Sequence, residues 1–187
     1  MKLQLSRAIL VAIVFVAISL VSLTYATVEA INYGSYWDAR SQLTSNVNRL
    51  HVETSSTNRS VTIQTTVSAT NPTDYSGMMV RYFELRLYFV KLGSNQTLFS
   101  GDSAGEIIDL ISTDNAPVGN PIGPHSTLIS VLTLHLSPSR SDAFKAFYQA
   151  NPAQVYGQTE VRAAVDSFLD TVLGPEIVQN DQTVPIS

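Results

Sequence analysis

A long uncharged run near the start constrains this chain more than any other feature. Residues Ala8–Ala26 (AILVAIVFVAISLVSLTYA) contain no charged side chain over nineteen positions. As a helix, such a run is about 28 Å long, close to the thickness of the hydrocarbon core of a bilayer. The hydroxyls of Ser19, Ser22 and Thr24 can donate to carbonyls of the same helix, so they do not interrupt it. The run predicts a transmembrane helix that contacts the lipid bilayer through residues 8–26.

The residues that flank the run predict its orientation. Lys2 and Arg7 precede it, and Glu29 follows it. Basic residues favour the cytoplasmic side, so we expect the N-terminus in the cytoplasm and the chain from about Thr27 onward outside the cell membrane. Aromatic residues that favour the headgroup layer cluster at the outer end of the run: Tyr25, Tyr33, Tyr36 and Trp37. Simple packing under the outer domain would explain Trp37 equally well.

Two alternatives to a retained anchor and one alternative function for it stay open. A cleaved signal peptide would fit cleavage at Val28-Glu29-Ala30 or Thr24-Tyr25-Ala26, although its apolar region is normally only about 7–15 residues long. A pilin-like filament subunit would be processed at Ser6-Arg7-Ala8, but no glycine precedes that cut and no acidic residue lies early in the run. An accessory subunit of a membrane enzyme complex would pack the small hydroxyl residues of the run against another helix.

Composition restricts the function of the remaining residues. Without the anchor about 150 residues remain, enough for one domain with its own core. The first 30 residues carry a net charge of +1 and the whole chain −4, so the rest carries −5. This mildly acidic balance argues against nucleic acid as a partner, because such binding needs basic patches. Cysteine is absent, which excludes disulfides, thiolate catalysis and cysteine-ligated metals.

Beyond the membrane the hydrophobic period changes to two, which is typical of β-strands. The clearest alternation has Phe83, Leu85, Leu87 and Phe89 on one face. The ranges expected to form strands are 61–68, 83–90, 97–99, 106–111, 128–136 and 159–171. The strand at 128–136 is apolar on both faces, so we expect both to be covered. One helix is expected before Asn151-Pro152, with Ser139 or Ser141 as its cap and Phe144, Phe147 and Tyr148 on one face.

These elements predict four segments. They are an anchor helix at 1–30, a connector at 31–45, a mainly β domain at 46–173 and a loose C-terminal tail at 174–187. The connector can continue the anchor helix until Gly34 offers a break. Several short strands separated by turns indicate an antiparallel β-sandwich for the third segment.

The order of elements resembles the type 2 late embryogenesis abundant family, also called the water stress and hypersensitive response domain. The likeness covers about residues 46–171, and Asn71-Pro72-Thr73 stands where the family usually has Asn-Pro-Asn. Its other residues are Val67-Ser68-Ala69-Thr70 before that turn, Tyr82, Leu85-Arg86-Leu87, Gly101, Pro124-His125-Ser126-Thr127 and Gly157. The resemblance implies an immunoglobulin-like β-sandwich without catalytic residues, placed outside a membrane by one N-terminal helix and linked to stress protection or partner binding.

The turn motif also has a purely structural interpretation. A residue before proline is kept out of the helical region, and the Asn71 side chain can bond the backbone ahead of it. Pro72 then ends strand pairing because it has no N–H to donate. This interpretation needs no ligand.

Residues that carry chemistry are dispersed. His51, His125 and His135 lie on different expected elements, so we predict no metal site. The acidic group Asp102, Glu106, Asp109 and Asp114 lacks the spacing of a calcium loop and is expected to be a solvated face. No G-x-S-x-G elbow or phosphate-binding glycine loop occurs. We expect no enzyme activity and no cofactor.

Two acceptor sequons occur, at Asn58 and Asn95, and both fall in expected loops. They are compatible with glycosylation and equally with plain polar turns. The prediction from the sequence is therefore a non-enzymatic, single-pass, extracytoplasmic β-sandwich with protein partners in a membrane or envelope assembly.

Overall fold

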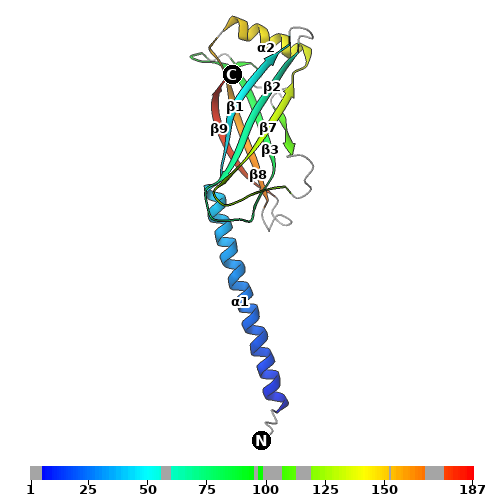
Figure 1. The fold of residues 1–187 in the computed structure, drawn as a ribbon, viewed down its shortest axis with the longest axis vertical. Coiled ribbons are helices and arrows are strands. Elements are labelled where there is room, and N and C mark those ends of the chain that lie inside the picture. Colours follow the sequence, from blue (N-terminus) through cyan, green and yellow to red (C-terminus); the bar gives the residue numbers. More distant parts are fainter. Residues whose placement is uncertain are drawn as a thin grey trace. The chain divides into compact units, whose positions relative to one another are not determined.

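The computed structural model describes residues 6–55, 60–94, 97–98, 107–112, 119–151, 153–166 and 175–187. The chain divides into two compact units, Met1–Asp38 and Ala39–Ser187. The first unit is helical, and the second, called the β-domain below, is mainly β with two antiparallel sheets (Figure 1). The predicted mainly β class with an apolar N-terminal helix is therefore confirmed.

One helix, α1 (Arg7–Gln42), occupies the described part of the first unit and continues into the second. It is long and apolar enough to cross a membrane: its best 18-residue window has a mean hydropathy of 2.6 and is 0% buried. Within it, the Thr24 hydroxyl donates to the Leu20 carbonyl (2.9 Å), as expected for a hydroxyl inside an apolar helix. The helix passes through Gly34 to Gln42, so the break expected at Gly34 and the separate connector at 31–45 are wrong. One helical glycine costs only about 1 kcal/mol, which its neighbours offset.

The smaller sheet has the order β1-β2-β7. Its strands are β1 (Thr44–Thr54), β2 (Val61–Asn71) and β7 (Ser126–His135), and neighbours run antiparallel. A bulge between Val47 and Arg49 shifts the register of β1 against β2. The strand at β7 was expected to be covered on both faces, but Ile129 and Val131 are 60% and 57% exposed. They lie on the outer face of the sheet, which the described residues leave uncovered.

The larger sheet is built around one long strand, β3 (Met78–Lys91). One edge of β3 pairs with β8 (Val155–Asp166), which pairs in turn with β9 (Glu176–Pro185). The other edge pairs with three short strands: β4 (Thr97–Leu98), β5 (Ile107–Ser112) and β6 (Asn120–Ile122). The tail expected at 174–187 is therefore wrong for Glu176–Pro185, because these residues pair along ten positions of β8.

A single hydrophobic core lies between the two sheets. The smaller sheet contributes Leu50 and Ile63, and the larger one contributes Phe83 and Val161, all 0–1% exposed. Along each strand these residues alternate with outward-facing ones, as the period of two predicts.

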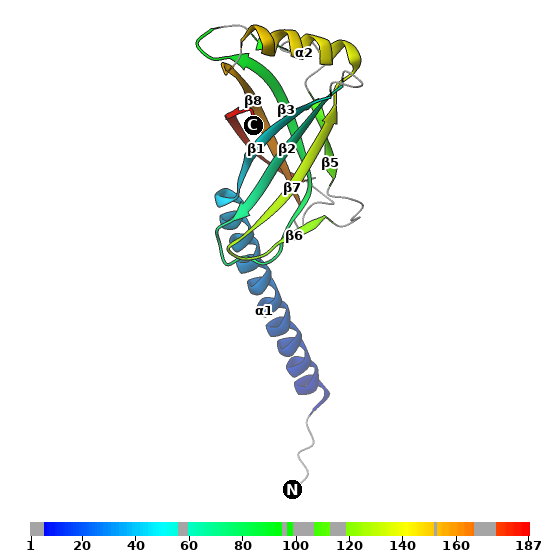
Figure 2. The ribbon, with the colours of Figure 1, turned by 45° about the horizontal axis from the view of Figure 1, so that its top comes forward.

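A short helix, α2 (Pro138–Ala150), lies across one end of the sheets (Figures 1 and 2). Its N-cap is Ser137 rather than the expected Ser139 or Ser141, because Pro138 takes the first helical turn, where its missing N–H has no cost. It ends at Ala150, before Asn151-Pro152 as predicted. Strand β1 starts at the opposite end, next to Ala39–Leu43, and its 11 residues carry the chain about 36 Å toward α2.

Candidate functional site

The Asn71-Pro72-Thr73 turn is held by the buried amide of Asn71. Its Nδ2 donates to the carbonyls of Tyr75 (2.8 Å) and Gly123 (3.2 Å), and its Oδ1 accepts from the Thr73 N–H (3.0 Å) and hydroxyl (2.7 Å). These bonds use the whole hydrogen-bonding capacity of the side chain. Burial raises the pKa of the nearby Tyr75. The motif joins β2 to the loop before β7 and offers no free group to a ligand.

The three histidines lie apart, each beside its own partner. His51 on β1 is 3.4 Å from Glu53, His125 is 2.9 Å from Asp74, and His135 on β7 is 3.0 Å from the Thr62 hydroxyl. Within the described ranges no group of three histidine or acidic side chains could hold a metal. Of the acidic group considered above, Asp102, Glu106 and Asp114 lie outside the described residues, as does the side chain of Asp109.

The remaining predicted positions lie either on α1 or outside the described residues. The aromatic residues Tyr25, Tyr33, Tyr36 and Trp37 all lie on α1, and the Trp37 ring packs edge-to-face against Tyr33 (5.9 Å) and Tyr36 (5.8 Å). Asn58 and Asn95, the two sequon asparagines, lie outside the described residues.

Charged side chains on the outer face of the larger sheet pair with one another. Glu84 and Arg86 on β3 face Arg162 and Glu160 on β8, and four N–O distances of 2.7–3.6 Å connect them. Each charge has two opposite neighbours, so this lattice is internally neutral. It stabilises the pairing of β3 with β8 and provides no net charge to attract a ligand.

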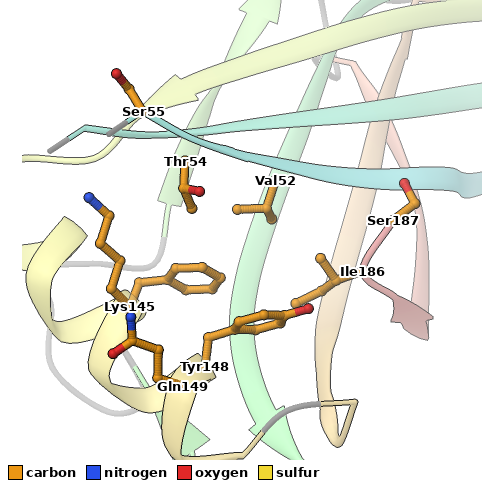
Figure 3. Close-up of a pocket in the computed structure, with 9 residues that line it drawn as sticks. Val52, Thr54, Ser55, Lys145, Tyr148, Gln149, Ile186 and Ser187 are labelled. Carbon is orange, nitrogen blue, oxygen red and sulfur yellow. The ribbon is translucent and has the colours of Figure 1, made fainter. Parts of the chain in front are cut away.

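The candidate site is a pocket between α2, the end of β1 and residues 186–187, and we call it the α2 pocket (Figure 3). Its volume is about 390 Å³, within the usual range for small-molecule sites. It is lined by Val52, Thr54, Ser55, Phe144, Lys145, Tyr148, Gln149, Ile186 and Ser187. Among the described residues of that lining, Lys145 is the one charged side chain.

Two hydrogen bonds of a buried serine fix α2 over the end of β2. The Ser141 hydroxyl accepts from the Val61 N–H (3.1 Å) and donates to the Leu136 carbonyl (3.3 Å). Phe144, one turn further along, is 1% exposed and packs edge-to-face on Phe89 of β3 at 4.7 Å. Helix α2, which forms one wall of the pocket, is therefore held by the hydrogen bonds of Ser141 and by the packing of Phe144.

The opposite wall is formed by residues that follow β9. Ile186 forms a parallel bridge with Leu50 of β1. The Ser187 N–H donates to the Leu50 carbonyl (2.9 Å), and the Ser187 carbonyl accepts from Val52 (3.4 Å). These bonds hold Ile186 beside Val52, and both side chains project into the space facing Tyr148 (Figure 3).

Aromatic rings line the helix side of the pocket. The Tyr148 ring stacks on Phe144 with centroids 5.8 Å apart and an interplanar angle of 19°. Phe144 is buried, whereas Tyr148 is 40% exposed and extends toward Ile186 (Figure 3). The pocket can therefore accept an apolar group against an already ordered aromatic surface.

Only the helix side of this pocket could be predicted from the sequence. The spacing of Phe144 and Tyr148 predicted a shared helix face, but nothing local indicated that residues 186–187 would close the other side. That wall depends on β9, which pairs with a strand formed by residues about 20 positions earlier.

Comparisons with known proteins show no family. No family model matches the chain, and no curated protein sequence matches it. Among solved structures, the sporulation control protein Spo0M from Bacillus subtilis is similar at 12% identity and a TM-score of 0.35, over 78% of this chain and 48% of that protein. A protein from Archaeoglobus fulgidus is similar at 9% identity and a TM-score of 0.35, over 78% and 96%. The chain thus spans about half the length of Spo0M, and the likeness carries no functional information.

Proposed function

We propose that this chain is a single-pass membrane protein whose β-domain acts outside the cell as a non-enzymatic binding module in a membrane or envelope assembly. The apolar surface of α1 carries the proposal. Ile9, Phe15 and Leu20 are 50–70% exposed, and the most apolar window of the helix is 0% buried by the chain. Exposing such a surface to water is unfavourable, whereas a bilayer accepts it.

The orientation follows from the positions of the charges. Lys2 and Arg7 precede the apolar run, and Glu29 follows it. The positive-inside tendency then favours a cytoplasmic N-terminus and an external β-domain. Within the β-domain, α2 lies at the end remote from the start of β1.

We also propose an immunoglobulin-like arrangement for the β-domain. Immunoglobulin sheets contain strands A, B and E side by side, and C, F and G side by side. Labelling β1, β2 and β7 as A, B and E, and β3, β8 and β9 as C, F and G, gives the observed neighbours in both sheets. The resemblance to the type 2 late embryogenesis abundant family implies the same sandwich, so a partner-binding role like that of the family is part of this proposal.

Cysteine labelling tests the topology directly, because the natural chain contains no cysteine. Thr133→Cys places a thiol on the exposed outer face of β7, and Gln4→Cys places one before the apolar run. A membrane-impermeant maleimide should label Thr133→Cys in intact cells and Gln4→Cys only after lysis. The unchanged protein is the control for background. Labelling of Gln4→Cys alone in intact cells would reverse the orientation, and extraction of the protein by alkaline carbonate would refute the anchor.

Intact mass of the purified protein separates the other outcomes. The proposal requires the apolar run to be present in the mature chain. A mature N-terminus at Ala8 together with fibres would favour the pilin-like subunit, and one after Ala26 or Ala30 would favour a cleaved signal peptide. Co-purification with polytopic proteins would favour an accessory subunit of a membrane complex. The same mass also reports glycans at Asn58 or Asn95.

A further inference from the structure

The α2 pocket combines three properties that together specify a ligand. Its described residues provide an apolar floor, an exposed aromatic ring at the edge and one cation. All of these lining residues belong to the β-domain.

The floor of the pocket excludes strongly polar ligands. Val52 and Ile186 are partly buried against the core, and Phe144 is almost completely buried. A ligand that fills this space removes apolar surface from water, which contributes roughly 25 cal/mol per Å². The part of the ligand that enters the pocket should therefore be hydrocarbon.

The edge of the pocket favours a flat ligand. Tyr148 is held parallel to the buried Phe144, which is itself fixed by Phe89. The Tyr148 ring lies 5.8 Å from that of Phe144, centroid to centroid, and the residue keeps 40% of its surface exposed. An aromatic ring of the ligand could pack on that prepared surface in an offset-stacked or edge-to-face manner without reorganising the protein.

The positive charge of Lys145 favours a negatively charged polar group on the ligand. Lys145 is half-buried, and its stem can lie along apolar surface while the ammonium stays at the rim. No acidic side chain lines the pocket among the described residues. Of the acidic residues nearest along the same elements, Glu53 lies beside His51 (3.4 Å), and Asp142, three positions before Lys145 on α2, is exposed and does not line the pocket. The amide of Gln149 and the hydroxyl of Thr54 add neutral hydrogen-bonding groups to the rim.

We propose that the α2 pocket binds a small aromatic carboxylate, with its ring against Tyr148 and its carboxylate beside the Lys145 ammonium. A carboxylate accepts charge-assisted hydrogen bonds from an ammonium, and these bonds are stronger than those of a neutral amide. The inference rests on the proposed binding role and names the ligand class for it. It does not depend on membrane anchoring, because every lining residue belongs to the β-domain.

The test uses the full chain in zwitterionic lipid nanodiscs and two probes that differ only in charge. Isothermal titration calorimetry compares 2-naphthylacetate with its neutral amide, 2-naphthylacetamide, and empty nanodiscs are subtracted from both. We expect the carboxylate to bind about ten-fold more tightly than the amide. If the protein proves not to be membrane-anchored, the same titration in buffer has the same meaning, so the two proposals fail separately.

Variants then locate the site. Lys145→Gln should abolish the preference for the carboxylate, whereas Lys145→Arg should keep it. Lys91→Gln on β3 removes one positive charge outside the pocket and should change nothing. Tyr148→Ala should weaken both probes by a similar factor, and circular dichroism checks that each variant is folded. No binding of the carboxylate, equal binding of the amide, or an unchanged preference in Lys145→Gln would overturn the proposal.

Discussion

Large apolar residues occur in both units of this chain, and the two units use them in opposite ways. On α1, Phe15 is 70% exposed, and apolar neighbours from Ile9 to Leu20 are exposed on every side of the helix. In the β-domain, Phe83 and Leu85 are 0% exposed between the sheets. A helix without a polar face requires an apolar solvent, whereas strands that alternate every second residue make an apolar interior of their own. The pattern of the apolar residues therefore matters more than their number.

A matched pair of phenylalanines gives the largest expected difference. Phe83→Ala should lower the free energy of unfolding of the β-domain by about 4 kcal/mol, because it leaves a cavity in the core. Phe15→Ala deletes the same atoms from α1 and should change the free energy of unfolding of the β-domain by less than about 0.5 kcal/mol. Denaturant unfolding of the full chain in nanodiscs, followed by circular dichroism, measures both. Equal losses would mean that α1 and the β-domain unfold together.

A matched pair of valines tests the membrane side of the comparison. Val16 on α1 and Val131 on β7 are 55% and 57% exposed. Val16→Arg should disfavour insertion by about 3 kcal/mol, since it places a charge near the centre of the apolar run. Val131→Arg should leave the membrane-bound fraction unchanged. Carbonate extraction of membranes quantifies the two variants, and release of both to the same extent would contradict this assignment.

A third comparison uses Asn71 in the β-domain and Thr24 on α1, two polar side chains that donate hydrogen bonds to backbone carbonyls. Asn71→Ala should destabilise the β-domain by about 2 kcal/mol, because it removes a buried amide that makes four hydrogen bonds across this turn. Thr24→Ala also removes a side-chain bond to a carbonyl, but that carbonyl already lies in a helix. We expect Thr24→Ala to change the free energy of unfolding of the β-domain by less than about 0.5 kcal/mol. Thermal melts of both variants measure the difference.

Two glycines give the smallest individual effects, and the two effects have opposite signs. A Cβ at Gly157 on β8 would collide with the side chains of Leu50 and Leu87 in the core. Gly157→Ala should therefore destabilise the β-domain by about 1.5 kcal/mol through overpacking. At Gly34 on α1 nothing lies within 4 Å of the added atom, so Gly34→Ala should stabilise the helix by about 1 kcal/mol. The β-domain melt should not change with Gly34→Ala; a rise in it would show that the helix supports the sheets.

Some of the fold was readable from the sequence because it depends on local pattern. The alternation around Phe83–Phe89 predicted the inner face of β3, and the uncharged run predicted α1. Strand β1 was not predicted, because a bulge between Val47 and Arg49 interrupts its alternation. Its buried residues Val47 and Leu50 are three positions apart instead of two.

Strand β9 was missed for a different reason. Its sequence, EIVQNDQTVP, is polar, and only Val184 in it is buried. Its place depends on backbone pairing with β8 and on amides that reach β1, where Asn180 Nδ2 donates to the Ser45 carbonyl (2.9 Å) and Gln182 Oε1 accepts from the Val47 N–H. Such contacts join residues more than 130 positions apart, so no local pattern signals them.

The sequence by itself determined the apolar helix, the mainly β character of the rest and the absence of cysteine chemistry. These properties follow from the period and type of side chains along a short stretch. Only the tertiary structure decided that α2, β1 and the residues after β9 would enclose a pocket, with Lys145 as the one charged side chain among its described lining residues. A pocket forms where segments that are distant in the sequence come together. Sheet pairing and core packing across the whole β-domain determine which segments these are.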